Sequence, residues 1–269
     1  MSDPLWDDLS LASIEEALVT RYVGQSFIYL DSTTSTQDRA REEALQGAPE
    51  GTMVITDEQT AGRGRFGRSW VSPRGSAIYL SLVMRPSQQQ LMALNMVAGL
   101  AVVHAVHEAT GLEARIKWPN DVQLSGKKFA GILIDTELSQ KGVEYAIIGV
   151  GLNVTLDPTQ HPEIADIATS LAFEKKEPVR RMPVLQALLT SIEELYEATK
   201  RGESLLPEWK RSLATLGRNV RVTWPGNTDK KFLVEEGVAE DVDEEGALLL
   251  RKDDGTLVKV VAGEVSLRG

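Results

Sequence analysis

The residues of this sequence that are best suited to chemistry lie in one short loop, 62–68. Its order Gly-Arg-Gly-Arg-Phe-Gly-Arg interleaves three arginines with three glycines. Arginine side chains bind carboxylates and phosphates through paired hydrogen bonds, and glycines let the backbone approach a ligand closely. Because three like charges this close repel one another, we expect a loop that is mobile when empty and ordered over a polyanion. The plain alternative is a solvated basic turn, which is less expected in an acidic chain.

The loop also fits two nucleotide-binding motifs, but its context argues against both. Residues 62–67 match G-x-G-x-x-G, and residues 62–69 nearly match G-x-x-x-x-G-K-[ST], with Arg68 in place of the lysine. Both motifs require a helix directly after the glycines, because its N-terminus meets the phosphate. Pro73 and Gly75 follow instead, so we expect no helix there.

Two lysine-containing strings carry further useful side chains. In residues 117–121, Lys-Trp-Pro-Asn-Asp, the side chains of Asn120 and Asp121 offer oxygens to a ligand or to Mg²⁺. Pro-Asn-Asp is also typical of a capped β-turn, which is the plain alternative. Lys128 begins a strongly apolar strand that continues to Ile134. This lysine either reaches into a buried cavity or extends to solvent from the edge of the sheet.

Two other strings suggest a binding surface. Gly149, Gly151 and Asn153 share one face of a strand whose other face is apolar. Such a flat face admits a ring or another backbone, or serves only close packing. The hydroxyl-rich string at residues 34–37 precedes a helix, where it either caps the helix or binds polar atoms of a small ligand.

Composition limits the classes of function. The chain has 269 residues, a net charge of −10 and no cysteine. The acidic balance argues against a dedicated nucleic-acid binder, and the absence of cysteine excludes disulfides, thiolate nucleophiles and zinc–sulfur sites. The acidic N-terminus lacks the order of a signal peptide, and we find no apolar run near the ~18 residues that span a bilayer. We therefore expect a cytoplasmic protein with no membrane partner.

The apolar periodicity predicts alternating helices and strands up to about residue 213. A short helix opens the chain, with Ser13 and Glu16 at capping-box spacing. Further helices are expected at 36–45, 91–109, 183–200 and 203–213, the first two with glycine stops at Gly47 and Gly111. Strands are expected at 26–30, 52–56, 77–84, 128–137 and 143–154, the third of these alternating and the last two joined as a hairpin.

The pattern changes near Leu216. Short strands separated by turn signals are expected at 220–224, 231–239, 247–250, 257–260 and 265–267. Five short strands in so few residues predict a small β-barrel. We therefore divide the chain into domains at 1–215 and 216–269.

Together these strings resemble those of the biotin protein ligase family, the biotin–[acetyl-CoA-carboxylase] ligases. The resemblance runs in order from about Phe27 to Asn153, with a matching C-terminal part from about Leu216. The arginine–glycine loop and the Lys-Trp-Pro-Asn-Asp string are its most specific elements. The resemblance implies an α+β fold, with a mixed sheet and flanking helices like those of class II aminoacyl-tRNA synthetases. It also implies an SH3-like barrel at the C-terminus.

The resemblance implies roles for individual residues. Residues 35–37 match the element that binds the ureido group of biotin, with residues 32–33 as a second register. The catalytic residues that it implies are Lys128, Arg65 and Arg68, and Asn120 and Asp121 are implied near the nucleotide and its metal. The residues expected to bind biotin or the adenylate are Ser35, Thr36, Gln37, Gln59, Arg63, Gly64, Arg65, Trp70, Lys128, Gly131, Gly149, Gly151 and Asn153.

The function that the resemblance implies is a two-step ligation. Biotin and ATP with Mg²⁺ form biotinyl-5′-AMP, and a lysine of a biotin carboxyl carrier protein then takes the biotin. The nearest alternative is a lipoate or octanoate ligase, which shares the fold but lacks the loop. Some family members carry an N-terminal DNA-binding domain. Here the first strand begins near Ser26, so we expect no DNA partner and no repressor function, while a homodimer stays open.

Overall fold

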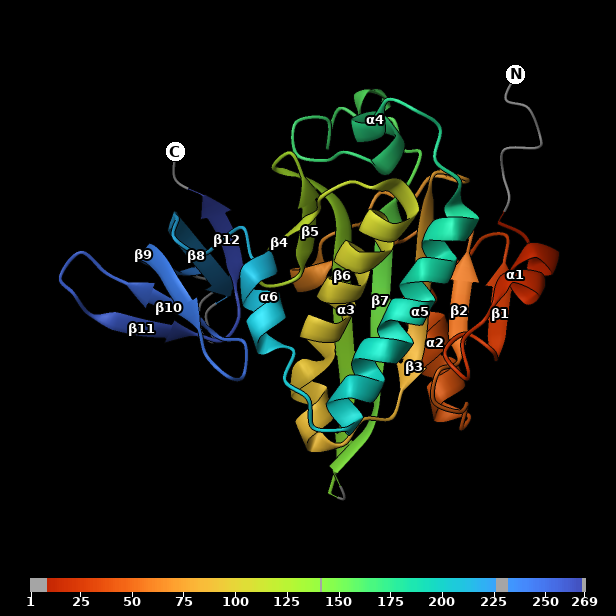
Figure 1. Cartoon of the computed structure of the whole chain (residues 1–269), viewed down its shortest axis with the longest axis horizontal. Helices are drawn as coiled ribbons and strands as arrows, with labels where there is room; N and C mark the ends of the chain where they lie inside the picture. The colour runs from red at the N-terminus through yellow and green to blue at the C-terminus, as the bar shows by residue number, and fades with distance from the viewer. Residues whose placement is uncertain (1–8, 141, 226–231, 268–269) are drawn as a thin grey trace.

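The computed structural model describes residues 9–140, 142–225 and 232–267. Within these ranges the chain forms two sheets flanked by helices (Figure 1). The helices are α1 (Leu11–Ala17), α2 (Thr36–Leu45), α3 (Gln88–Thr110), α4 (Leu171–Lys175), α5 (Arg181–Lys200) and α6 (Leu206–Ser212), with short 3-10 turns η1 (Arg65–Gly67) and η2 (Pro158–Gln160). The strands of the larger sheet are β1 (Phe27–Leu30), β2 (Met53–Thr56), β3 (Ala77–Met84), β4 (Arg115–Lys117), β5 (Asp121–Leu124), β6 (Lys127–Ser139) and β7 (Gly142–Asn153).

The larger sheet is mixed, as expected. Its described strands follow the order β1-β2-β3-β7-β6-β5-β4. β1 and β2 run parallel, and every other neighbouring pair is antiparallel. The predicted hairpin of β6 and β7 is confirmed, although Lys141 in its turn lies outside the described residues.

Helices cover both faces of this sheet. α3 and α5 lie side by side over one face, as Figure 1 shows, and α2 packs against the other. Along β7 the side chains of Ile148, Val150 and Leu152 enter the α3 side of the core, whereas Tyr145 and Ile147 pack near α2. The alternation therefore places residues 149, 151 and 153 on the α2 side, beyond the start of that helix. This is the part of the sheet that carries the candidate site.

Some local details differ from the sequence-based expectations. α1 begins one turn earlier than expected, because Ser10 caps it and Ser13 closes the capping box from inside the helix. All residues of β3 are buried, rather than alternating, because helices cover both of its faces. α4 was not predicted; Ser170 caps this single turn. α6 is shorter than expected and begins at Leu206, just before a proline.

α3 is long and apolar enough to cross a membrane by length and composition alone, although no apolar run of that length was expected from the sequence. In the structure 56% of its most apolar window is buried. The buried residues include Leu94, Leu100 and Val102, which belong to the hydrophobic core. Its apolar surface therefore packs against the sheet and α5.

The smaller sheet is antiparallel, with described strands in the order β11-β10-β9-β8-β12. They are β8 (Asn219–Pro225), β9 (Phe232–Val242), β10 (Leu248–Arg251), β11 (Leu257–Val260) and β12 (Glu264–Leu267). Five strands were predicted here and five are present within the described residues; the predicted start at Lys231 lies outside them. The sheet packs beside α6 and β4 (Figure 1). The Trp118 side chain fixes the contact, since its Nε1 donates to the carbonyl of Gly246 at 2.9 Å.

Candidate active site

Two adjoining cavities lie on the α2 side of the larger sheet. The first has a volume of about 50 Å³ and lies between the N-terminus of α2, strands β3, β6 and β7, and the 62–70 segment. The second has a volume of about 510 Å³ and extends from the same segment toward β4, β5 and β12. The larger volume falls in the range of small-molecule sites, about 300–1,000 Å³. Together the two cavities form an elongated space suited to a ligand with two parts.

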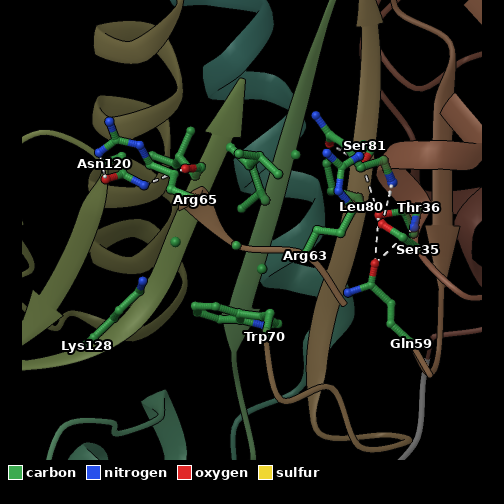
Figure 2. Close-up of a pocket in the computed structure, with 18 residues that line it drawn as sticks. Ser35, Thr36, Gln59, Arg63, Arg65, Trp70, Leu80, Ser81, Asn120 and Lys128 are labelled. Atoms are coloured by element: carbon green, nitrogen blue, oxygen red, sulfur yellow. Dashed lines mark hydrogen bonds between the residues drawn. The ribbon is translucent and has the colours of Figure 1, made fainter. Parts of the chain in front are cut away.

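The N-terminus of α2 forms one end of the first cavity. Ser35 caps the helix, since its hydroxyl accepts a hydrogen bond from the amide of Gln37 at 3.3 Å. Gln59 accepts from the Thr36 amide at 2.9 Å and donates to Ser72 at 3.1 Å. Figure 2 shows Ser35, Thr36 and Gln59 together at this end. Ser35 therefore both caps the helix and lines the cavity, and the alternative register at residues 32–33 lies outside the lining.

The flat strand surface predicted at Gly149 and Gly151 is covered by side chains of the protein itself. A Cβ atom added at Gly151 would lie 2.7 Å from Cε2 and Nε1 of the Trp70 ring. One added at Gly131 would lie 2.9 Å from Cζ3 of the same ring. The Trp70 indole thus lies across two glycines on neighbouring strands. Real Cβ atoms do not approach this closely, so only glycine fits beneath the ring in this conformation.

The 62–70 segment folds back on itself as a small hairpin. The amide of Trp70 donates to the carbonyl of Gly62 at 2.9 Å, and the amide of Gly64 donates to that of Arg68 at 2.7 Å. The tip turns at Phe66 and Gly67, which have φ values of 56° and 74°. No helix starts between Ser69 and Ser76, all of which the structure describes. This confirms that neither nucleotide-fold motif applies.

Each loop arginine has a separate partner, so their charges are not gathered on one anion. Arg63 pairs with Asp38 at 2.6 Å, Arg65 donates to Asn120 Oδ1 at 3.1 Å and to the Gly263 carbonyl at 3.0 Å, and Arg68 pairs with Glu264. Two of these contacts join the loop to the start of β12 in the smaller sheet. Burial lowers the pKa of Arg65, and the negative charges of Asp121 and Glu264 act in the opposite direction.

Lys128 lies where the two cavities meet and lines both. Its Nζ is 2.6 Å from Asp121 Oδ1 and 4.9 Å from the centre of a Trp70 ring. Its backbone is held at both ends, since its amide donates to Ile167 and its carbonyl accepts from Thr169, each at 2.9 Å. Figure 2 shows Lys128 at the opposite end of the pocket from Gln59, with Trp70 between them.

Two buried polar atoms at the site have no partner. Among the described residues, the buried side-chain atoms without a hydrogen bond are Trp70 Nε1, Asn153 Oδ1 and Trp209 Nε1. The first two belong to residues that line the second cavity. Because buried polar atoms in proteins are rarely left unpaired, an unpaired donor and an unpaired acceptor here indicate a place for a ligand or water.

Every residue that the sequence singled out as a site residue lines one of the two cavities. Arg68, Asp121 and Asn153 line the second only, and the others line the first or both. Sequence reasoning missed Ser81, whose hydroxyl lies 2.9 Å from Thr36 Oγ1. A serine inside an otherwise apolar strand was the available signal. It also missed Glu264, for which no local pattern exists.

Comparison with known proteins agrees with this geometry. Residues 29–153 match the model of the biotin/lipoate A/B protein ligase family, and residues 215–268 match that of the biotin protein ligase C-terminal domain. The chain is 38% identical over 264 residues to the bifunctional ligase/repressor BirA of Bacillus subtilis, covering 96% of this chain and 79% of the relative. It is 34% identical to the biotin–[acetyl-CoA-carboxylase] ligase of Mycobacterium tuberculosis, covering 98% and 97% of the two chains.

A solved structure gives the same result. The biotin protein ligase from Aquifex aeolicus in complex with biotin and ATP aligns with a TM-score of 0.74 and 30% identity, over 91% of this chain and 99% of that one. Fold and site thus define a protein of the biotin/lipoate ligase class. Within that class, the chain belongs to the biotin protein ligase family.

Proposed function

We propose that this protein is an ATP-dependent biotin–[biotin carboxyl-carrier protein] ligase that works through biotinyl-5′-AMP. The relatives named as biotin–[acetyl-CoA-carboxylase] ligases and the solved ligase with biotin and ATP support this function. The observation that carries the proposal is the position of Lys128 between a small cavity beside α2 and a larger one toward β12. We place biotin at the first cavity, which must widen to admit it, and ATP in the second.

The residues around Lys128 suit the first step. The biotin carboxylate attacks the α-phosphorus of ATP, and pyrophosphate leaves with the electrons of the broken bond. Since both reactants are anions, cations must offset their repulsion. Lys128, Arg65 and Arg68 are the side chains that supply this charge. In the second step a lysine amine of the carrier attacks the acyl carbon, and AMP leaves.

The loop suits the second requirement of such chemistry, which is to keep a reactive anhydride from water. Trp70 and Arg65 lie between the two cavities and line both. An adenylate that bridges the cavities would replace the protein partners of the loop arginines with its phosphate. The loop then covers the intermediate until the carrier lysine arrives.

The donor set at the second cavity fits Mg²⁺ bound with ATP. Mg²⁺ prefers one or two carboxylates together with phosphate oxygens. Asp121 supplies one carboxylate beside Lys128, and Asn120 supplies an amide oxygen that now accepts from Arg65. When bound, the ion would offset charge on the phosphates.

Four broader expectations belong with this function. We place the domain boundary near residue 216, because the larger sheet ends at Asn153 and the smaller one begins at Asn219. A cytoplasmic location and a homodimer stay predictions from the sequence and the family. The carrier protein is the last expectation, and any carboxylase domain with an accessible, unmodified acceptor lysine qualifies.

The test is ATP–pyrophosphate exchange with and without biotin, followed by transfer of labelled biotin to a carrier domain. We expect exchange only when biotin is present, and transfer to one carrier lysine. Lipoate and octanoate serve as controls in the same assay. Exchange that depends on lipoate instead of biotin would favour the alternative, a lipoate ligase. ATP hydrolysis in the absence of biotin, without any ATP–pyrophosphate exchange, would contradict the proposal.

A further inference from the structure

The second cavity contains one cation without a protein partner. Its lining includes the side chains of Arg65, Arg68, Lys117 and Lys128. The other three are engaged as described above. Across the described ranges, 9–140, 142–225 and 232–267, Lys117 Nζ forms neither an ion pair nor a hydrogen bond. The cavity, which Asp121, Asp166 and Glu264 also line, therefore holds one lysine whose partner is still to be supplied.

The strand that carries Lys117 explains its position. In β4 the side chain of Ile116 is fully buried in the core, so the alternation turns Lys117 to the opposite face. Across the β4–β5 pair, Lys117 stands opposite Asp121. Burial lowers the pKa of Lys117; Asp121 acts in the opposite direction and Lys128 adds to the lowering. A half-buried ammonium without a close partner is unfavourable, and a bound anion would remove that cost.

The order of the side chains along the cavities identifies the anion. Lys128 lines both cavities, whereas Lys117 lines only the second. Asp121 lies between them, paired with Lys128 and opposite Lys117. In a displacement at phosphorus, the attacking and leaving oxygens lie roughly in line on opposite sides. If the carboxylate attacks from the first cavity at Lys128, the leaving group points into the second, toward Lys117.

We propose that Lys117 binds the β- and γ-phosphates of ATP and holds the pyrophosphate as it leaves. The inference rests on the proposed function. The carboxylate oxygen bonds to the α-phosphorus, the bond from that phosphorus to the bridging oxygen breaks, and pyrophosphate keeps the electron pair. No proton moves and no redox partner is needed. The ammonium of Lys117 offsets the charge that grows on the leaving group.

The first test separates the two half-reactions in Lys117→Met. We expect the KM for inorganic pyrophosphate in biotin-dependent exchange to rise about tenfold to a hundredfold, the usual value of one charged hydrogen bond. Transfer of biotin from synthetic biotinyl-5′-AMP to the carrier should stay within about twofold of the parent, because that step contains no pyrophosphate. Arg115→Met is the matched control: Arg115 lies on the same strand but is exposed and lines neither cavity.

Lys117→Arg should keep most of the affinity for pyrophosphate, because it keeps the charge. The proposal is overturned if Lys117→Met leaves the KM for pyrophosphate unchanged, or if both half-reactions fall equally. If the unaltered protein shows no biotin-dependent ATP–pyrophosphate exchange, that result contradicts the proposed function instead.

The second test uses the unaltered protein and does not depend on the folding of a variant. Lysines are acetylated with acetic anhydride, with and without inorganic pyrophosphate, and mapped by mass spectrometry. We expect pyrophosphate to protect Lys117 and to leave Lys127 unchanged, since Lys127 lines neither cavity. Equal acetylation of Lys117 in both samples overturns the proposal, whatever the enzyme assays show.

Discussion

At the scale of single residues, Lys128 is the side chain whose removal we expect to lower activity most. Its ammonium lies 2.6 Å from Asp121 at the junction of the cavities, where the attacking carboxylate and the α-phosphate must meet. We expect Lys128→Ala to lower biotin-dependent pyrophosphate release by at least about a hundredfold, a typical loss when a charge that stabilises a transition state is removed.

Lys127→Ala is the control, because Lys127 is the neighbouring lysine but its Nζ donates to the Ala165 carbonyl instead of entering the cavities. This variant should retain its activity. Pyrophosphate release at the parent rate in Lys128→Ala would show that the charge at this position is not required for adenylate formation.

Gly151 tests how closely Trp70 covers the strand. An alanine there places a Cβ 2.7 Å from the ring, so either the ring or the strand must move. We expect Gly151→Ala to lower the free energy of unfolding by about 1–3 kcal/mol, measured by urea denaturation. In a Trp70→Ala background the same substitution should cost less than about 0.5 kcal/mol, because the two no longer collide. If Gly151→Ala lowers the free energy of unfolding equally in both backgrounds, the Trp70 ring does not lie over Gly151.

Short sequence motifs predicted many of the residues that line the two cavities, because such motifs carry chemistry in consecutive or alternating residues. The arginines of the loop, the glycines of β7 and the 35–37 string were all identified in this way. Lys117 was read only as part of its string, since nothing in the sequence showed that it would lack a partner. Glu264 was missed because its role depends on a contact with Arg68 across 196 positions of sequence.

At the scale of elements, the 62–70 hairpin is the feature that predicts behaviour. Arg65 ties it to Asn120 and to the Gly263 carbonyl, and its guanidinium also lies 4.8 Å from the centre of the Phe66 ring. These contacts hold the hairpin over both cavities. A hairpin that has lost them should open more often.

We therefore expect Arg65→Ala to release biotinyl-5′-AMP about tenfold to a hundredfold faster, the value of one charged hydrogen bond. The measurement is the ratio of pyrophosphate formed to carrier biotinylated, which should rise as adenylate escapes to solution. Arg211→Ala, an exposed arginine of α6 outside both cavities, is the control. Retention of the adenylate at the parent rate would exclude a covering role for this side chain.

Most helices and strands were predicted within a few residues of their bounds, including four-residue strands such as β11, but α4 was not predicted at all. α2 and β3 match their predicted bounds because apolar spacing and clear stops mark them. α4 has only one turn, too short to carry a period. The order of strands in the larger sheet could not be predicted from the sequence. β3 pairs with β7, which lies beyond α3 in the chain, and no local sequence pattern specifies that pairing.

At the scale of the whole molecule, the smaller sheet completes the site. The change in pattern near residue 216 predicted a separate unit. What the sequence did not show is that Gly263 and Glu264 would lie against the loop and line the second cavity. This follows from how the sheet packs on β4 and α6, where the Trp118 indole donates to the Gly246 carbonyl.

The opposite end of the molecule depends on a buried carboxylate. Glu193 of α5 accepts hydrogen bonds from the backbone amides of residues 21–23, at 2.9 to 3.1 Å, just before β1. Burial alone would raise the pKa of Glu193, but the three amides outweigh it and hold the pKa below its ordinary value of 4.5. The ionised form is therefore favoured in the folded protein, and it joins the N-terminal segment to the central helices.

We expect Glu193→Gln to lower the free energy of unfolding by about 2 kcal/mol at pH 7, because the amide offers weaker hydrogen bonds than the carboxylate. Since the folded pKa is depressed, this stabilisation is fully present above pH 4.5 and is lost as the pH falls through the folded value. Urea denaturation at several pH values should therefore show the parent and the variant converging in acid. Glu194→Gln, on the exposed face of the same helix, should change stability by less than about 0.5 kcal/mol throughout. A difference for Glu193→Gln that stays constant down to acid pH would mean that shape, and not charge, makes this contact.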